Sequence, residues 1–191
     1  MLKSFSPSSD KPIDLIWHTL NRREVSFMAF NNPKWRRFVS AHLLKRVEPI
    51  AGSIVYCKLL GLPNRIIGTP DHTGIYVGNR RVIELNGNEK IIEVDYYNFL
   101  NGSSVRSGTE LYVACDMNGN VLYDPAIARR AIAARNTHNG YHLIRNNCHM
   151  FTSRCIKGTN NDPLDATFKN VERNIKKHFG VPVISWRTVK Q

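Results

Sequence analysis

The feature that most constrains the fold is a series of short strand-like segments in the middle of the chain. Each segment is rich in Val, Ile, Leu or Tyr, and Gly, Pro or Asn turn signals separate it from the next. This succession of strand-like segments and turn signals predicts an antiparallel meander. The five segments are SIVYCKLL (53–60), HTGIYVG (72–78), RRVIELNG (80–87), KIIEVDYY (90–97) and TELYVACD (109–116).

Helical patterns flank this block on both sides. Before it, apolar residues recur at helical spacing from Pro12 to Leu20 and again from Pro33 onward. The order of helices, strands and helices predicts an α+β fold, with residues 1–46 as a helical extension and 47–191 as the main domain. After the block, the predicted elements are a helix over AIARRAIAARN (126–136), a strand over YHLIR (141–145), a helix over NCHMFTSRCIKG (147–158) and a helix over 162–179.

Composition excludes several classes of protein. Of the 191 residues, 42% are hydrophobic, enough for one sizeable core, and no run of about 18 apolar residues occurs. The opening MLKSFSPSSDKP lacks the apolar stretch of a signal peptide, so we expect a cytoplasmic or otherwise leaderless protein without a membrane span. The four cysteines have no CxxC spacing, and the scattered histidines do not offer the three or four converging ligands that a zinc site needs. We therefore expect reduced thiols, no metal and no cofactor.

Basic charge is concentrated toward the two ends of the chain. The net charge is +12, and it divides into +5 over residues 1–50, −2 over 51–125 and +9 over 126–191. A solvated basic face is the default interpretation. Beyond it, the amphipathic segment from Pro33 to Val47, with its Trp and Arg residues, favours an anionic membrane surface. Nucleic acid is disfavoured because no zinc-finger, RRM or helix-turn-helix signature is present.

Cys148 is the candidate nucleophile. It follows Asn146 and Asn147, both good helix N-caps, and precedes an apolar helical pattern. A thiol in the first turn of a helix lies in the positive field of the helix N-terminus, which favours the thiolate. The alternative, a buried structural thiol, fits the other three cysteines, which are Cys57, Cys115 and Cys155.

A nucleophilic thiol needs a base, and His72 heads one of the predicted strands. The register of the following hairpin decides what His72 can contact. A two-residue loop at Asn79-Arg80 places Ile75 opposite Glu84 and mixes apolar and charged residues on one face.

A three-residue loop over 78–80 instead pairs Ile75 with Ile83 and sorts the two faces of the hairpin. His72 and Glu84 then share a face on a diagonal, so that Glu84 can orient the imidazole. Gly74 lies between them and leaves space for a third group or a substrate. We predict this register, although a strand His beside a Glu is also common as a surface pair.

Two segments together resemble a known family. HTGIYVG followed by RVIEL, and YHLIRNNCHMF after an Ala/Arg helix, are similar to the lecithin:retinol acyltransferase-like group of the permuted papain-like (NlpC-type) superfamily. The stretch VEPIAGSIVY resembles the lead-in to the first strand of that group, and the resemblance runs from about Val47 to Lys157. It implies a permuted papain-like catalytic domain in which His72 is the base, Glu84 orients it and Cys148 is the nucleophile.

The sequence departs from the family pattern at two places. Glu84 stands where the family usually has a second His, a change that is chemically suitable for orienting the base. His149 and Met150 stand where the family has Glu and His after the nucleophile. His149 is a possible second base, but adjacent helix residues point about 100° apart, so His72 is the better candidate.

Three functions remain open from the sequence. The first is a cysteine-dependent acyl hydrolase or acyltransferase acting on a lipid-type ester or amide, which the basic flanks favour. The second is a peptidase or amidase acting on a peptide, cell-wall or ubiquitin-like amide. The third is a non-catalytic binding protein on the same scaffold. In the catalytic cases, backbone N–H groups at the start of the Cys148 helix are expected to stabilise the oxyanion.

Overall fold

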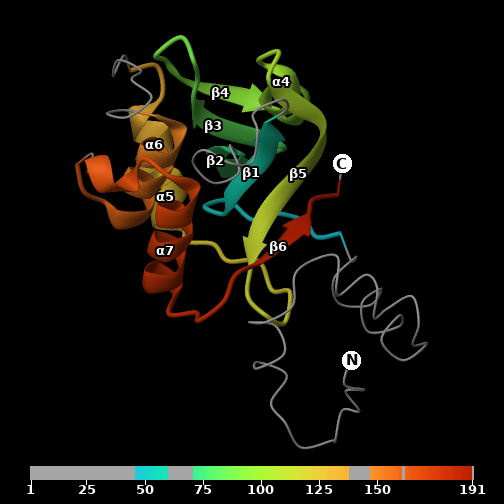
Figure 1. Ribbon diagram of the computed structural model, residues 1–191, viewed down its shortest axis with the longest axis vertical. Coiled ribbons are helices and arrows are strands. Elements are labelled where there is room, and N and C mark those ends of the chain that lie inside the picture. The colour runs from blue at the N-terminus through green and yellow to red at the C-terminus, as the bar shows by residue number, and fades with distance from the viewer. Residues whose placement is uncertain (1–45, 60–70, 138–146, 161, 191) are drawn as a thin grey trace, which may run out of the picture. The chain divides into compact units, whose positions relative to one another are not determined.

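A six-stranded antiparallel sheet forms the centre of the fold, with four helices packed against it in the described part of the chain (Figure 1). The computed structural model describes residues 46–59, 71–137, 147–160 and 162–190. The sheet order is β4-β3-β2-β1-β5-β6. The strands are β1 (Ile54–Leu59), β2 (Asp71–Gly78), β3 (Arg81–Leu85), β4 (Ile91–Asp95), β5 (Arg106–Cys115) and β6 (Ser185–Thr188). The predicted α+β class with an antiparallel sheet is confirmed.

The predicted meander is right for the first four strands and wrong for the fifth. Strand β5 pairs with β1 on the far side of the sheet and not with β4. The reason is helix α4 (Tyr96–Asn101), which begins after the N-cap Asp95 inside the segment predicted as one strand and carries the chain back across the sheet. Strand β6, which the sequence analysis missed, extends the sheet beyond β5. The expected strand at 141–145 and residues 1–45 of the extension expected over 1–46 lie outside the described residues.

The β2–β3 hairpin has the predicted register, but its turn differs from the predicted one. Ile75 pairs with Ile83, as expected, and Gly78 pairs with Arg81. The loop is therefore a two-residue turn, in which Asn79 and Arg80 both have positive φ. A bulge between Tyr76 and Gly78 supplies the extra residue that a three-residue loop was expected to supply.

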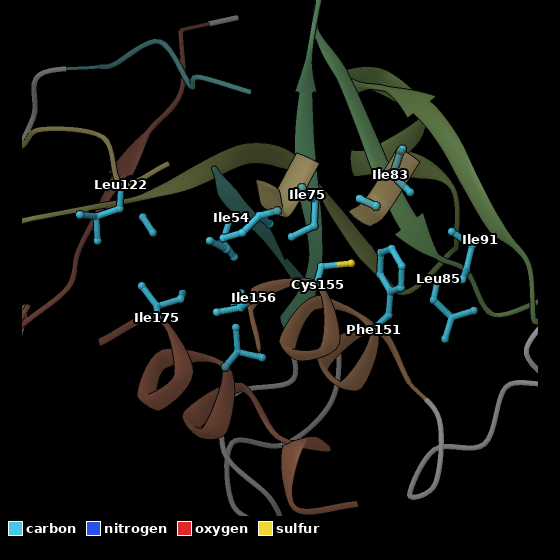
Figure 2. Close-up of a cluster of buried hydrophobic side chains, with 14 residues drawn as sticks. Ile54, Ile75, Ile83, Leu85, Ile91, Leu122, Phe151, Cys155, Ile156 and Ile175 are labelled. Carbon is cyan, nitrogen blue, oxygen red and sulfur yellow. The ribbon is translucent and has the colours of Figure 1, made fainter. Parts of the chain in front are cut away.

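Three helices cover one face of the sheet (Figure 1). They are α5 (Pro125–Ala134), α6 (Cys148–Lys157) and α7 (Phe168–Phe179). Their apolar side chains meet those of β1, β2 and β3 in one core, where Figure 2 shows Phe151 of α6 beside Ile75 and Leu85 of the sheet. The helix expected over 162–179 is divided, because Pro163–Asp165 forms a separate 3-10 turn and Thr167 caps α7. No described helix has the length and apolar character needed to span a bilayer.

The other face of the sheet is covered by α4. Phe99 of α4 is fully buried there with Val82, and both side chains lie next to Gly74. A Cβ at Gly74 would lie 2.9 Å from the Phe99 ring and 2.7 Å from the Val82 side chain. Phe99 is therefore the third group for which Gly74 leaves space.

Candidate active site

Cys148 is the first residue of α6, as the sequence predicted. Asn147 is the N-cap, and its side-chain Oδ1 accepts hydrogen bonds from the N–H groups of His149 and Met150, each at 3.0 Å. Asn147 also donates through Nδ2 to the carbonyl of Ala166, which ties the helix start to the segment before α7. This cap fixes Cys148 at the positive end of the helix.

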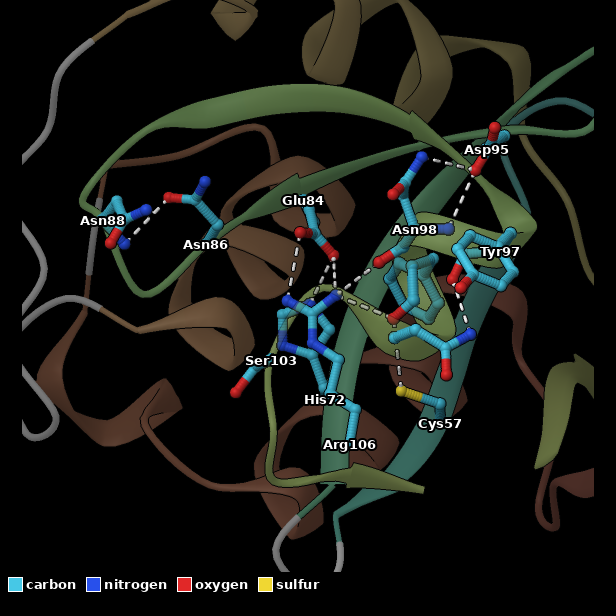
Figure 3. Close-up of polar contacts among 12 residues, drawn as sticks. Cys57, His72, Glu84, Asn86, Asn88, Asp95, Tyr97, Asn98, Ser103 and Arg106 are labelled. Carbon is cyan, nitrogen blue, oxygen red and sulfur yellow. Dashed lines mark hydrogen bonds and ion pairs between the residues drawn. The ribbon is translucent and has the colours of Figure 1, made fainter. Parts of the chain in front are cut away.

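His72 and Glu84 meet on the α4 face of the sheet. His72 is the second residue of β2, and Glu84 is the fourth residue of β3. His72 Nε2 lies 2.7 Å from Glu84 Oε2, and both side chains are buried (Figure 3). The carboxylate accepts a hydrogen bond from Nε2, so this nitrogen carries a hydrogen. Nδ1 is then the ring nitrogen left for proton transfer.

Arg106, at the start of β5, is the member of this cluster that sequence analysis missed. Its Nη1 donates to Glu84 Oε2 at 2.9 Å and its Nη2 donates to Glu84 Oε1 at 3.0 Å, a two-point pair with the carboxylate (Figure 3). Nη1 also donates to the carbonyl of Phe99 at 2.7 Å, and the guanidinium lies 5.7 Å from the Phe99 ring centre. Arg106 lies in NGSSVRSG, a stretch with the composition of an exposed turn, so no sequence signal marked it.

Cys148 completes the cluster through His72. The two side chains interact, and each changes the pKa of the other. Burial lowers the pKa of His72, but the negative charges of Glu84 and Cys148 outweigh this and raise it to about 9. Burial raises the pKa of the Cys148 thiol, but the charges and hydrogen bonds of His149 and His72 bring it well below its usual range.

The electrostatic result is a buried row of alternating charges. Burial raises the pKa of the Glu84 carboxyl, while His72 and then Arg106 lower it, and the carboxyl ends below its usual range. A thiolate at Cys148, an imidazolium at His72, a carboxylate at Glu84 and a guanidinium at Arg106 therefore follow one another. The row has no net charge, which reduces the cost of burying four ions together.

The remaining cysteines lie in different surroundings. Burial raises the pKa of Cys57, of Cys115 and of Cys155 to about 12 in each case. Cys155 shares α6 with Cys148 but packs in the apolar core. Within the described ranges, no group of three or more His, Cys, Asp or Glu residues is gathered as a metal site would require.

His149 is also part of this site. Its Nδ1 lies 3.2 Å from Thr73 Oγ1, and it lowers the pKa of the Cys148 thiol. Thr73 in turn accepts a hydrogen bond from Thr152 of α6 at 3.0 Å. The sequence pointed to His149 as a second base but gave no signal for the two threonines.

Comparisons of the chain with protein-family models, with curated proteins and with solved structures found no match. The arrangement offers a thiolate, a proton donor bonded to it and a carboxylate behind that donor. These are the groups needed for nucleophilic attack and for protonation of a leaving group.

Proposed function

We propose that this chain is a cysteine-dependent acyl hydrolase or acyltransferase that works through a thioester on Cys148. Residues 47–191 would then form a permuted papain-like domain similar to the lecithin:retinol acyltransferase-like family. The observation that carries the proposal is the 2.7 Å hydrogen bond from His72 to Glu84, together with the mutual effect of His72 and Cys148 on each other's pKa. Nucleophile, base and orienting acid stand in the order that acyl transfer requires.

In the first half-reaction, the Cys148 sulfur attacks the carbonyl carbon of the substrate and forms a C–S bond. The carbonyl oxygen takes the negative charge of the tetrahedral intermediate. His72 then gives its proton to the leaving oxygen or nitrogen, the bond to that atom breaks, and a thioester remains. Glu84 stabilises the imidazolium before this transfer and keeps Nδ1 directed at the reacting atoms.

In the second half-reaction, His72 takes a proton from water or from an acceptor hydroxyl or amine. The activated oxygen or nitrogen attacks the thioester, and the C–S bond breaks to release Cys148 as a thiolate. Water gives hydrolysis, and another acceptor gives acyl transfer. The Asn147 cap already uses the N–H groups of His149 and Met150, so the N–H of Cys148 is the helix-start donor left for the oxyanion.

We propose a lipid-type ester or amide as the substrate, presented at an anionic surface. The support is the basic charge of the chain, +12 in total. Several basic side chains on the described helices are exposed, which fits attraction to anionic headgroups. They are Arg129 of α5 and Lys169, Arg173 and Lys177 of α7.

The test is covalent trapping of the acyl-enzyme. The full chain is incubated with acyl thioesters, with phospholipid vesicles and with activated peptide amides, and intact mass spectrometry then measures any acyl adduct. Wild type is expected to carry an adduct on Cys148, and Cys148→Ala is expected to carry none. Cys155→Ala, on the same helix, is the matched control and keeps the adduct. Wild type without an adduct from any substrate would favour the non-catalytic binding protein.

Vesicle composition then separates a lipid substrate from a peptide substrate. Binding and turnover on vesicles that contain phosphatidylglycerol should exceed those on neutral phosphatidylcholine vesicles, and high salt should remove the difference. Turnover of peptide amides with no dependence on vesicles would favour the peptidase alternative.

A further inference from the structure

His149 is held in a defined orientation beside the nucleophile. Its side chain is buried, and the Thr73 hydroxyl lies 3.2 Å from Nδ1. The ring also meets the edge of Phe168, the first residue of α7, at 6.0 Å between ring centres. Contacts from β2 and from α7 therefore fix the imidazole on two sides.

Two buried threonines lie beside one ring nitrogen of His149. Thr152 donates its hydroxyl hydrogen to Thr73 Oγ1, and both threonines are fully buried. Thr73 has one hydroxyl hydrogen of its own, and Nδ1 of His149 is the ring nitrogen beside it. With Nδ1 directed at Thr73, Nε2 is the ring nitrogen of His149 that can offer a hydrogen-bond donor to another group.

His149, like His72, lowers the pKa of the Cys148 thiol. Burial raises the pKa of the thiol, and among the groups that lower it His149 comes ahead of His72. His72, however, is bonded to a carboxylate and His149 is bonded to a hydroxyl. A hydroxyl does not stabilise an imidazolium as a carboxylate does, so the two histidines are suited to different tasks.

Other ionisable groups stand farther along the same cluster. They are Glu84 and Arg106, which reach Cys148 through His72, and Cys57 of β1, which pairs with His72 across the sheet and interacts with Cys148. Asp71 at the start of β2 acts on Cys57. None of these groups belongs to α6. His149, by contrast, follows Cys148 directly on that helix.

We propose that His149 is a second hydrogen-bond donor to the Cys148 thiolate, held by Thr73 and Thr152, while His72 alone transfers protons. The catalytic consequence rests on the proposed function, but the thiolate-holding role does not. The role predicts a division of effects between the two histidines. Loss of His149 weakens the thiolate and leaves proton transfer intact, whereas loss of His72 removes proton transfer at every pH.

The test measures the rate of Cys148 alkylation by iodoacetamide as a function of pH in the folded full chain. In His149→Ala the midpoint should rise by about one pH unit or more, which is about tenfold slower alkylation below the midpoint. Thr73→Val should shift the midpoint in the same direction, and Thr73→Ser, which keeps the hydroxyl, should restore it. Turnover of His149→Ala should recover as pH rises, and turnover of His72→Ala should not.

Several outcomes would overturn the proposal. One is an unchanged alkylation midpoint in folded His149→Ala, or in folded His149→Gln if the alanine variant does not fold. Another is loss of turnover at all pH values in His149→Ala with unchanged alkylation, since His149 would then be the base. Wild type could also show a lowered alkylation midpoint that depends on His149 and Thr73 but no acyl turnover on any substrate. That result would support the thiolate role of His149 and reject the proposed function.

Discussion

His72 Nε2 and Glu84 Oε2 are 2.7 Å apart in a buried pair that joins neighbouring strands. The charge of Glu84 is the largest of the effects that raise the pKa of His72 against the effect of burial. In Glu84→Gln an acceptor remains, but the charge is lost and the pKa of His72 should fall from about 9. Turnover should decrease less than in His72→Ala, and the alkaline limit of activity should move to lower pH. A pH–rate profile of both variants makes the measurement, and an unmoved alkaline limit in Glu84→Gln would contradict it.

Arg106 should matter for stability because it neutralises Glu84 in the interior. Arg106→Met leaves the carboxylate with His72 as its one charged partner, and breaking a buried pair in this way costs about 3–5 kcal/mol. The double variant Glu84→Gln, Arg106→Met should recover part of that loss, because no carboxylate is then left unpaired. Urea unfolding of the single and double variants measures this coupling. Additive losses would show that the two side chains do not stabilise each other.

Gly74 should not tolerate a methyl group. In Gly74→Ala the new Cβ would press on Val82, on Phe99 and on the carbonyl of Ile83, with a cost of about 1–3 kcal/mol. Gly87→Ala is the matched control, because a Cβ at Gly87 meets nothing within 4 Å. Thermal unfolding should separate the two variants. Equal melting temperatures would mean that Phe99 can move aside.

The pH dependence of turnover follows from the thiolate–imidazolium pair. Activity should rise as Cys148 loses its proton, at a pH well below that of an ordinary thiol, because the pKa of Cys148 is lowered. It should fall as pH passes through about 9, where His72 loses the proton that the leaving group needs. The two limits belong to the coupled pair and not to either residue alone. Activity that keeps rising above pH 9 would exclude His72 as the acid.

Local patterns predicted the parts of the site that depend on sequence neighbours. Asn147 before Cys148 marked the helix start, and the alternation of apolar residues around Ile75 and Ile83 fixed the hairpin register. The register was right even though the turn was wrong, because burial of one face constrains pairing more strongly than the loop does.

Contacts between distant elements could not be predicted in the same way. Arg106 reaches Glu84 only because β5 returns beside β1, and that return depends on α4, a short helix inside a strand-like segment. Thr73 and Thr152 are 79 residues apart and meet only when α6 packs on β2. Single-residue propensities carry no information on such pairings.

Alkylation of the four cysteines across a pH range from about 5 to 10 tests the central claim most directly. The claim is that Cys148 is a thiolate held by His72, and peptide mass spectrometry follows each cysteine separately. Cys148 should react with a midpoint well below about 8.5, the value of an ordinary thiol. Cys57, Cys115 and Cys155 should stay unreactive in the folded chain, because burial raises their pKa to about 12. A Cys148 midpoint at or above the ordinary value, or faster reaction of any of the other three, would contradict the account.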